Sequence, residues 1–396
     1  MDKKKILFVE QNMDGTIGGS HYCLLYLIQR LNRDAFEPVT VFHESNQLVD
    51  LFSREGATFV MDKFRLSTFK ITPVRKILNL ILSIRTVARC YLFLKKHKID
   101  LIHLNNSVAG GYDTWLPAAL LAKIPCITHD RTYFRFDKLN LKFFHVLSRR
   151  FSKVLTVSDV IRNNLIDQGF NPEQVETVYD GIDAAAYRNR VKKTRADIAD
   201  EFKIGPDDYI IGLVGNIREW KGQELLIDSL NILQKNIPNF KCLLVGDVAK
   251  NSDEDTRFKE RLIKKIGAYG LAGKVIFTGY RSDVPDIVNA LDVQINSSIE
   301  PDPFPHVILE GMSLGKVVIA TNLGGAVESI KDGETGFLVS AKDPSDLSEK
   351  IRLVLTDKPL RETMSRKARE RVENFLSLEK NIKHTEDIYY SILRKG

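Results

Sequence analysis

Residues 208–215 read DYIIGLVG, an apolar run that ends in glycine. Such a continuous run is typical of a strand buried on both faces, as in a parallel sheet covered by helices. Gly215 allows a tight turn out of the strand. The next residues, 216–222, read NIREWKG and place Arg218 and Lys221 near the start of the following helix. Two cations there predict a diphosphate site, because arginine can bind two phosphate oxygens and lysine adds a point charge; the alternative is two solvated surface charges.

Similar apolar runs alternate with helical patterns along the 396 residues. This alternation predicts an α/β fold with doubly wound parallel sheets. The expected strands are 5–10, 38–42, 57–60, 100–104, 125–128, 153–157, 209–214, 241–245, 274–277, 291–295, 317–320 and 337–339. A polar, charged stretch, 184–205, interrupts the pattern and is expected to connect two domains. Ligands of such sheets bind beyond the carboxyl ends of the strands.

A second informative stretch is 300–313, which reads EPDPFPHVILEGMS. Its three prolines hold the loop extended, and Pro305 suits the first position of a helix. The backbone N–H groups of 304–308 are then expected to be free for a ligand. Glu310 follows three apolar residues, so its charge is costly to bury without a partner. A hydroxyl-rich ligand would be such a partner; the alternative is a hydrogen bond to a nearby backbone N–H.

This stretch resembles the Glu-x7-Glu signature of the retaining nucleotide-sugar glycosyltransferases of family 4, which have the GT-B fold. In that family the first acid lies beside the donor sugar and the second binds the ribose of the nucleotide. The resemblance implies that Glu310 is the second acid and Asp302 the first, with Glu300 as the alternative because the family more often has glutamate there. The donor-binding residues that it implies in this stretch are Glu300, Phe304, Pro305, His306, Val307 and Glu310.

Further segments resemble the family in the same order. The family binds the diphosphate through an Arg and a Lys, which here are Arg218 and Lys221, and a His like His129 reaches the donor sugar; alternatively, His129 is a satisfied residue at a strand end. His129, Asp302, Arg218 and Lys221 are therefore the expected catalytic residues. Other residues expected at or beside the donor site are Gly15, Gly18 and Gly19 in the loop NMDGTIGGS, Asp180 in the turn TVYDGID, and Gly215, Tyr280, Gly324, Gly325 and Glu328.

The resemblance implies a GT-B architecture of two Rossmann-like domains, 1–190 for the acceptor and 191–377 for the nucleotide sugar, with a last helix within 378–396 that returns to the first domain. It implies transfer from a UDP- or GDP-sugar to a glycan or lipid-linked acceptor in surface polysaccharide assembly, with retention and with no metal or cofactor. A nucleotide-sugar epimerase of GT-B architecture is one alternative. A non-catalytic protein that binds membrane or nucleic acid is another, although no nucleic-acid module is visible and we expect no nucleic-acid partner.

Charge is unevenly distributed. Residues 51–150 contain 18 Lys and Arg against 6 Asp and Glu, while the whole chain has a net charge of +7. Segments 63–98 and 134–153 mix apolar residues with cations, a pattern that suits an anionic membrane surface. We therefore expect a cytoplasmic protein that associates peripherally with the inner face of a membrane. The alternative is that 74–96 forms an amphipathic helix that packs on the sheet with solvated arginines.

The remaining features agree with a cytoplasmic protein. The cysteines, Cys23, Cys90, Cys126 and Cys242, lie in apolar segments without metal or redox spacing, so we expect reduced core residues. No signal peptide precedes the first expected strand, and no window is long and apolar enough to span a membrane. The acidic residues 253–255 are expected to be solvated, in a loop between a strand and a helix.

Overall fold

The computed structural model describes residues 3–11, 17–61, 72–106, 114–133, 148–249 and 252–394, without the side chains of 72–81. Its contacts divide the chain into two compact units. The first unit is Met1–Tyr179 with Asn381–Gly396, and the second is Asp180–Lys380. The chain therefore passes between the units at residues 179–180 and 380–381, whereas the expected bounds were 190 and 377.

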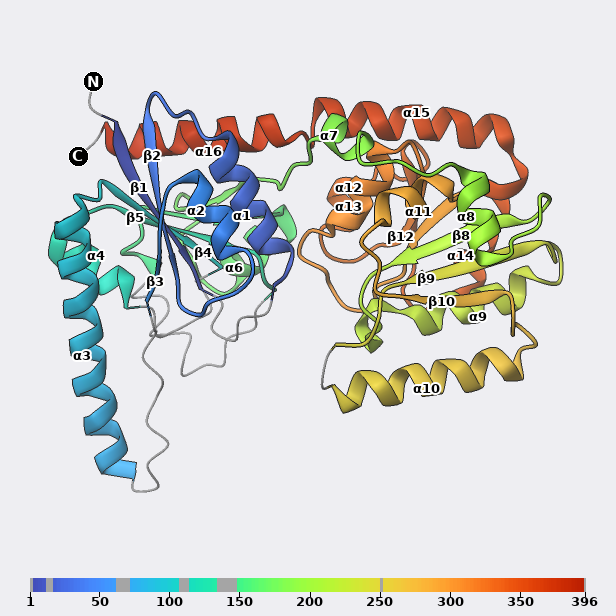
Figure 1. Cartoon of the computed structure of the whole chain (residues 1–396), viewed down its shortest axis with the longest axis horizontal. Coiled ribbons are helices and arrows are strands. Elements are labelled where there is room, and N and C mark those ends of the chain that lie inside the picture. Colours follow the sequence, from blue (N-terminus) through green and yellow to red (C-terminus); the bar gives the residue numbers. More distant parts are fainter. Residues whose placement is uncertain are drawn as a thin grey trace. The chain divides into compact units, whose positions relative to one another are not determined.

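The first unit is built on a seven-stranded parallel sheet with the order β3-β2-β1-β4-β5-β6-β7. Figure 1 labels strands β1 to β5 of this sheet. Its strands are β1 (Lys4–Glu10), β2 (Phe36–Phe42), β3 (Ala57–Val60), β4 (Leu101–Asn105), β5 (Cys126–Asp130), β6 (Lys153–Thr156) and β7 (Val175–Thr177). Six of them lie where the sequence predicted strands. The seventh, β7, has only three residues, of which Val175 alone is fully buried, so it lacks the apolar run that revealed the others.

The helices of the first unit are α1 (Gly19–Arg30), α2 (Val49–Glu55), α3 (Thr72–His97), α4 (Trp115–Ala122), α6 (Asp159–Asp167) and most of α16 (Leu378–Leu393). Residues of α16 reach the sheet of this unit: Tyr389 is fully buried, and its hydroxyl lies 2.5 Å from Nδ1 of His103 on β4. Glu386 accepts a hydrogen bond of 2.6 Å from the backbone N–H of Asn32. These contacts confirm the predicted return of the last helix to the first domain.

The second unit contains a six-stranded parallel sheet with the order β10-β9-β8-β11-β12-β13. Its strands are β8 (Tyr209–Val214), β9 (Phe240–Val245), β10 (Val275–Gly279), β11 (Val293–Asn296), β12 (Val317–Thr321) and β13 (Gly336–Val339). All six strands were predicted within two residues of either end. Ile210 and Ile211 are fully buried, in agreement with a strand covered on both faces. Two doubly wound parallel sheets confirm the predicted α/β class.

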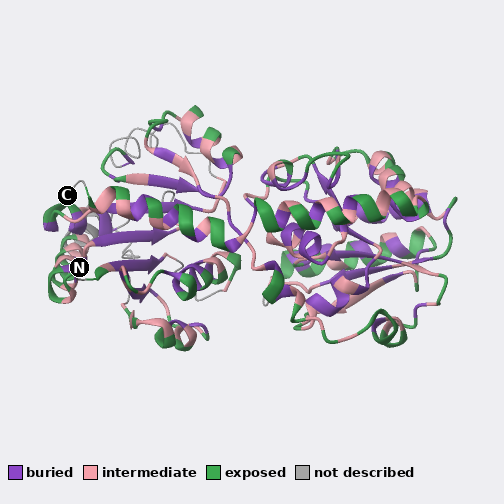
Figure 2. Cartoon of the chain, turned by 90° about the horizontal axis from the view of Figure 1, so that it is seen from above, coloured by how far each residue is buried: buried purple, intermediate pink, exposed green. Residues whose placement is uncertain are grey.

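The helices of the second unit are α7 (Ala184–Arg188), α8 (Arg195–Phe202), α9 (Gln223–Leu233), α10 (Asp253–Ala268), α11 (Val284–Ala290), α12 (His306–Ser313), α13 (Ala326–Ser329), α14 (Pro344–Thr356) and α15 (Lys358–Asn374). The stretch 184–205, expected as a connection, instead belongs to this unit and carries α7 and α8. Ile198 of α8 is fully buried, and Tyr187 of α7 nearly so. Two apolar anchors among many charges were too few to reveal these helices in the sequence. Figure 2 shows that the strands are mostly buried while the helices have exposed faces.

The cysteines were expected to be reduced core residues, and no segment was expected to span a membrane. All four cysteines are free thiols; Cys90, Cys126 and Cys242 are buried, whereas Cys23 is half-buried. Among the described residues, none of the helices has the length and apolar character that crossing a membrane requires.

Candidate active site

The predicted diphosphate loop leaves the second sheet where the strand order reverses. β8 and β11 are adjacent parallel strands, and the connections that follow them lead to opposite sides of the sheet. Such a point is the usual ligand site of doubly wound folds. Gly215 follows β8 with a φ of +156°, and its N–H donates a 2.9 Å hydrogen bond to the carbonyl of Val245. The loops after β8 and β11 therefore both begin at this crevice.

Two predicted site residues meet there. The Nζ atom of Lys221 lies 2.7 Å from Oδ2 of Asp302, and the two side chains are 19% and 14% exposed. The same ammonium group lies 4.0 Å from the centroid of the Trp220 ring, which adds a cation–π contact. A pair so largely withdrawn from water is held in one geometry, and it interacts more strongly than a fully solvated pair. The structure thus brings together the predicted lysine and the predicted first acid.

Arg218, the other predicted cation, has a partner that the sequence analysis did not identify. Its Nε lies 3.2 Å from Oδ2 of Asp255, whose side chain is 11% exposed, while Arg218 is 42% exposed. Asp255 lies in the first turn of α10, and its N–H binds the hydroxyl of Ser252. Residues 253–255 therefore begin a helix rather than lie in a loop, and Asp255 is buried, whereas Asp253 and Glu254 are exposed as expected. The spacing of Ser252 and Asp255 matches an N-capping box and could have indicated the helix start.

Gly222 is a glycine of the predicted diphosphate loop that the sequence analysis missed. It has a φ of +68°, and a Cβ atom there would lie 1.7 Å from the carbonyl oxygen of Ser297. The hydroxyl of Ser297 donates a 2.8 Å hydrogen bond to the carbonyl of Gly222. The N–H of Ile299 donates to the carbonyl of Trp220 at 2.8 Å. These contacts fix the Arg218–Lys221 turn against the end of β11.

Gly324 and Gly325, predicted beside the nucleotide, support the loop that carries Asp302. The N–H of Gly325 donates a 2.8 Å hydrogen bond to the carbonyl of Asp302. A Cβ atom on Gly324 would lie 2.0 Å from that carbonyl oxygen, and its φ is +58°. A Cβ atom on Gly325 would lie 2.4 Å from the carbonyl oxygen of Pro303. Only glycine leaves room for this close approach of two backbone segments.

The predicted helix after the loop is α12, and it differs from expectation at its start. Pro305 is the N-cap rather than the first helical residue. The N–H of Ile308 donates a 3.0 Å hydrogen bond to the carbonyl of Pro305. Contrary to the prediction, this N–H is therefore not free for a ligand. The carbonyl of Val307 accepts a 2.6 Å hydrogen bond from the amide of Gln294. Phe304 and Pro305 are buried and anchor the loop.

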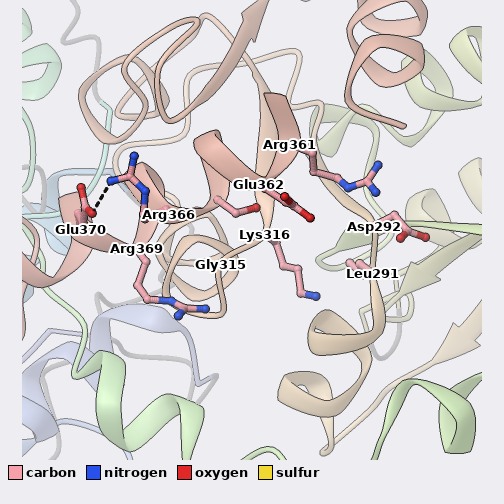
Figure 3. Close-up of a pocket in the computed structure, with 10 residues that line it drawn as sticks. Leu291, Asp292, Gly315, Lys316, Arg361, Glu362, Arg366, Arg369 and Glu370 are labelled. Atoms are coloured by element: carbon pink, nitrogen blue, oxygen red, sulfur yellow. Dashed lines mark hydrogen bonds and ion pairs between the residues drawn. The ribbon is translucent and has the colours of Figure 1, made fainter. Parts of the chain in front are cut away.

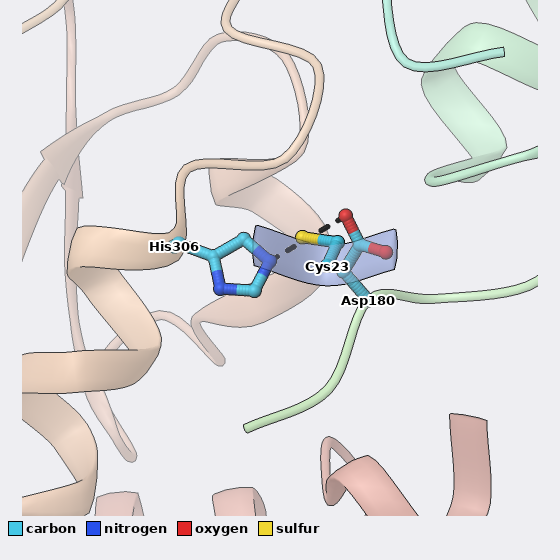
Figure 4. Close-up of side chains that lie close together, drawn as sticks. All are labelled: Cys23, Asp180 and His306. Atoms are coloured by element: carbon cyan, nitrogen blue, oxygen red, sulfur yellow. Dashed lines mark ion pairs between the residues drawn. The ribbon is translucent and has the colours of Figure 1, made fainter. Parts of the chain in front are cut away.

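Glu310 has side-chain partners in α7 and α12 of the same unit. Burial raises the pKa of its carboxyl, while the charge of His306, a hydrogen bond with Tyr187 and the charge of Arg190 oppose the shift. The imidazole Nε2 of His306 lies 3.4 Å from Oδ2 of Asp180 (Figure 4). Tyr187 and Arg190 had no signal in the sequence, because they lie in the stretch that was expected to be a connection.

Three other predicted residues lie at or near the surface. Glu300 is exposed, in contrast to Asp302. Tyr280 is 85% exposed and directly follows Gly279, the last residue of β10, which has a φ of +70°. Glu328 is in α13, and its carbonyl accepts a 2.6 Å hydrogen bond from Arg371.

Other predicted site residues, among them Gly18, Gly19 and His129, belong to the first unit. Gly18 is the N-cap of α1, which starts at Gly19, and the N–H of Gly18 donates to Nδ1 of His21 at 3.3 Å. A Cβ atom on either glycine would meet nothing within 4 Å. Gly15 lies outside the described residues. His129 is the penultimate residue of β5, is 1% exposed, and its ring centroid lies 5.6 Å from that of His103.

The carboxyl edge of this first sheet contains polar residues that the sequence analysis missed. The amide of Asn105 donates a 2.6 Å hydrogen bond to Oε2 of Glu10, and Nε of Arg131 donates to Oδ1 of Asn105 at 2.9 Å. Burial raises the pKa of Asp130 to about 7, against the opposing effect of backbone hydrogen bonds from Thr132 and Arg131. Polar residues that end apolar strands, as in ILFVE, were the available signal.

Two family models match the chain. The family model "Glycosyl transferases group 1" matches residues 194–371, and the model "Glycosyltransferase Family 4" matches residues 17–186. Among relatives, the chain is 22% identical to the UDP-Gal:alpha-D-GlcNAc-diphosphoundecaprenol alpha-1,3-galactosyltransferase of Escherichia coli, over 94% of this chain and 97% of that protein. It is 24% identical to the capsular polysaccharide biosynthesis glycosyltransferase CapM of Staphylococcus aureus, over 82% and 86%.

Solved structures share the fold. A glycosyltransferase from Rickettsia africae superposes with a TM-score of 0.86 at 22% identity, over 100% of both chains. HepE of Anabaena in complex with UDP superposes with a TM-score of 0.82 at 24% identity, over 98% of this chain and 100% of that one. The chain therefore belongs to the family 4 glycosyltransferases of GT-B fold, and it is a glycosyltransferase that uses a nucleotide-sugar donor.

Proposed function

We propose that this protein transfers a hexosyl group from a UDP- or GDP-sugar to a hydroxyl of a lipid-linked or glycan acceptor in surface polysaccharide assembly. The supporting observation is the pairing of Lys221 with Asp302 at the crevice between β8 and β11, beside Arg218. A diphosphate that enters this crevice meets two cations, and a sugar attached to it lies near a carboxylate. A nucleotide-sugar donor has an anionic diphosphate and a hydroxyl-rich sugar, so it needs both the cations and the carboxylate.

Rate enhancement is expected from charge stabilisation of the leaving group. As the bond from the anomeric carbon to the diphosphate oxygen breaks, negative charge grows on the diphosphate, and the sugar takes on oxocarbenium character. Lys221 and Arg218 then stabilise the transition state more than the ground state. Asp302, with Glu300 as the alternative, would hold sugar hydroxyls and face the developing positive charge. His129 of the first unit is proposed for the same sugar.

Retention and metal independence are part of the same proposal. The acceptor oxygen would form its bond to the anomeric carbon on the face that the leaving group vacates, and its proton would pass to an oxygen of the departing phosphate. With the two cations neutralising the diphosphate, this chain has residues for a role that a divalent metal could otherwise fill. Product anomeric configuration, read by NMR, and activity after treatment with a chelator test these two points separately.

A lipid-linked acceptor is supported by the name of the Escherichia coli relative, whose acceptor is a diphosphoundecaprenol-linked sugar. The first unit offers a surface for such an acceptor's membrane. Ile84 and Leu92 on α3 are 60% and 65% exposed, and Leu121 on α4 is 67% exposed. These two helices pack against each other. We propose that this surface, the α3–α4 surface, associates peripherally with the inner face of an anionic membrane.

Cations accompany the exposed apolar residues of the α3–α4 surface. Arg85, Arg89 and Lys96 are exposed on α3, and Lys123 is exposed just after α4. On a helix, residues 84, 88 and 92 follow one face, and 85, 89 and 96 lie beside them. Each cation near an anionic surface contributes about 1 kcal/mol. Parts of the two segments predicted to bind membrane, namely 63–71, the side chains of 72–81 and 134–147, lie outside the described residues.

A donor and acceptor screen tests the activity. The full chain is incubated with UDP- and GDP-hexoses, with and without a diphosphoundecaprenol-linked sugar, and release of the nucleoside diphosphate is followed together with the products. Acceptor-dependent release is the expected result. Conversion of the donor into an epimer with no acceptor would replace the proposal by an epimerase. No turnover of any donor, by a chain that binds vesicles, would favour a non-catalytic membrane-binding protein.

A further inference from the structure

A cavity of about 530 Å³ lies at the other edge of the second unit's sheet (Figure 3). Its lining includes Leu291 and Asp292, which precede β11, and Gly315 and Lys316, which precede β12. Because all strands of this sheet are parallel, these residues lie at its amino edge, whereas Lys221 and the other predicted donor residues follow the carboxyl ends. A strand of about five residues at roughly 3.3 Å each separates the two edges by about 15 Å. The cavity is therefore distinct from the donor crevice.

The acidic residues that line this amino-edge cavity already have partners. The carboxylate of Asp292 lies 2.9 Å from an Nη atom of Arg195 and also accepts a 2.7 Å hydrogen bond from a backbone N–H. Glu370 pairs with Arg366 at 2.7 Å, as the dashed line in Figure 3 shows. The third acidic residue, Glu362, lies 3.8 Å from the ammonium group of a lysine one turn earlier in α15. The negative charges of the lining are thus largely matched.

Three cations remain in the lining: Lys316, Arg361 and Arg369. Lys316 donates a 2.6 Å hydrogen bond to a carbonyl oxygen at the end of α11, and Arg361 donates to two carbonyl oxygens near the end of α14 at 2.8 and 2.9 Å. Neutral carbonyls do not cancel their charge. Within the part of the chain that the structure describes, none of the three cations forms an ion pair with a carboxylate. The cavity therefore has an excess of positive charge.

The surroundings of Lys316 support this view. Burial lowers its pKa to about 8, Asp292 opposes the shift, and the charges of Arg195, Arg369 and Arg361 add to it. The three arginines therefore disfavour the charged form of Lys316, which Asp292 favours, and this repulsion is present without a bound anion. An anion placed among them would relieve the repulsion and satisfy their hydrogen-bond donors.

The backbone makes room for this arrangement at Gly315. A Cβ atom there would lie 2.5 Å from an Nη atom of Arg369, and the φ of Gly315 is +69°. Glycine thus lets the guanidinium group lie close to the start of β12, near Lys316. Guanidinium groups bind phosphate oxygens in pairs, and an ammonium group adds a point charge. The volume of the cavity is within the range of sites for small ligands and exceeds what a bare phosphate needs.

We propose that the amino-edge cavity is a second anion site, which binds the phosphate group of a small phosphorylated molecule through Lys316, Arg361 and Arg369. This site is independent of the donor crevice and of the proposed function. It lies where α12 ends and β12 begins, and it uses residues from α15 that have no part in the donor site.

Isothermal titration of the full chain with inorganic phosphate and with glycerol 3-phosphate tests the proposal. Arg369→Gln is the main variant, because Arg369 is exposed and its loss should not disturb the fold. Arg369→Gln is expected to weaken the binding of both anions about tenfold, because it removes one charged group that donates hydrogen bonds. Lys367→Gln removes the same charge from the same helix at a residue outside the lining and is expected to leave binding unchanged. Lys221→Ala should also leave it unchanged.

Two results would overturn the proposal. One is the absence of measurable binding of phosphate and of glycerol 3-phosphate at millimolar concentrations. The other is binding that Lys221→Ala abolishes and Arg369→Gln leaves intact, because the phosphate would then occupy the donor crevice.

The pH dependence of sulfate binding gives a second readout, because sulfate remains a dianion between pH 7 and 9. Lys316 loses its proton in this range, so the affinity for sulfate should fall as the pH rises. Lys316→Met should bind sulfate more weakly at pH 7 and show a smaller pH dependence. Equal pH dependence in this variant and the parent would exclude Lys316 from the site. Should Lys316→Met fail to fold, the Arg369→Gln comparison still decides.

The phosphate could come from a free molecule or from a lipid headgroup, and vesicles separate the two. Parent and Arg369→Gln proteins are sedimented with phosphatidylglycerol vesicles at low salt. We expect equal vesicle binding by both, with only glycerol 3-phosphate binding weakened in the variant. Loss of both vesicle binding and glycerol 3-phosphate binding in Arg369→Gln would show that the cavity binds a lipid headgroup. That result would overturn the assignment to a small molecule.

Discussion

The ammonium group of Lys221 lies 2.7 Å from a carboxylate oxygen of Asp302, a residue 81 positions later in the chain. The two come from loops that follow adjacent strands, so the fold itself creates the pair. A diphosphate at the crevice would compete with Asp302 for the lysine. We infer that donor binding exchanges one anion for another, which leaves the carboxylate near the hydroxyls of the sugar. The site residues can therefore be tested individually.

Lys221→Ala is predicted to lower kcat by about 100- to 1,000-fold, as for loss of one group that stabilises a developing anion. The effect should be on turnover more than on KM, because the charge on the diphosphate grows as the bond breaks. Steady-state kinetics with the donor found in the screen measures it. Lys358→Ala, at a lysine that is 75% exposed, serves as the matched control and should be unaffected. Near-normal kcat in Lys221→Ala would remove this lysine from the diphosphate site.

Asp302→Asn and Glu300→Gln form a pair of isosteric changes that identifies the acid beside the sugar. Asp302 is 14% exposed and holds Lys221, whereas Glu300 is exposed. Asp302→Asn is expected to reduce kcat about 100-fold. Glu300→Gln should change it roughly threefold or less, as is usual for a surface substitution. The reverse order of effects in steady-state kinetics would assign the sugar to Glu300.

Gly324→Ala is predicted to destabilise the second unit and to inactivate the enzyme. The new Cβ atom would lie 2.0 Å from the carbonyl oxygen of Asp302, and the φ of +58° adds strain. The cost is about 2–4 kcal/mol, which combines the left-handed backbone with overpacking. Gly333→Ala is the matched control: its φ is +71°, but its Cβ atom would meet nothing within 4 Å. It should cost only about 1–2 kcal/mol in denaturant unfolding and leave kcat unchanged. Equal costs in both variants would show that the contact with Asp302 is unimportant.

Apolar runs made most of the fold predictable from the sequence. The six strands of the second sheet were located because each is an apolar run bounded by polar or glycine residues, as in DYIIGLVG. Strand β7 and helices α7 and α8 were missed because each buries only one or two apolar side chains. Their residues are held by tertiary contacts, which leave little local pattern.

The candidate site was predictable in its residue types but less so in its pairings. Motif position identified Lys221 and Asp302, but not the ion pair between them. Asp255 was misread, since a carboxylate that neutralises Arg218 looks the same in sequence as a solvated one. Gly222 could not be singled out, because its importance lies in the carbonyl of Ser297, 75 residues away in the chain.

Asp130→Asn is predicted to raise the free energy of unfolding, relative to the parent protein, more at pH 8 than at pH 5. Burial raises the pKa of Asp130 from 3.8 to about 7. Between about pH 4 and 7 the native state therefore holds a proton that the unfolded state releases, so the free energy of unfolding falls as the pH rises and levels off above 7. A shift of this size corresponds to at most about 4 kcal/mol. Asparagine cannot ionise, and it can still accept the 3.0 Å hydrogen bond from the N–H of Thr132.

Urea unfolding of parent and Asp130→Asn proteins at several pH values measures this effect. The difference in unfolding free energy should move in favour of the variant as the pH rises from 5 to 7. Asp50→Asn makes the same chemical change at an exposed position on α2 and should show no such trend. A difference that stays constant with pH would mean that Asp130 is ionised throughout.

Leu92→Glu and Leu121→Glu are predicted to weaken binding to anionic vesicles at low salt. The two leucines are 65% and 67% exposed on the α3–α4 surface, so their replacement should not disturb the core. Each change removes an apolar contact worth about 1.5–3 kcal/mol and adds a repelled charge, which corresponds to about tenfold or more in affinity. Co-sedimentation with phosphatidylglycerol vesicles measures the loss. Ile263→Glu, at an exposed isoleucine on α10 of the second unit, is the matched control.

The salt dependence of the same assay separates apolar insertion from charge attraction. If the exposed cations of α3 contribute, parent binding should weaken between low salt and about 0.15 M, where the Debye length is about 8 Å. The leucine variants should bind less than Ile263→Glu at every salt concentration, because insertion of apolar side chains is not screened. Equal binding of all three variants, or no binding of the parent at low salt, would leave the lipid-linked acceptor without a docking surface on this protein.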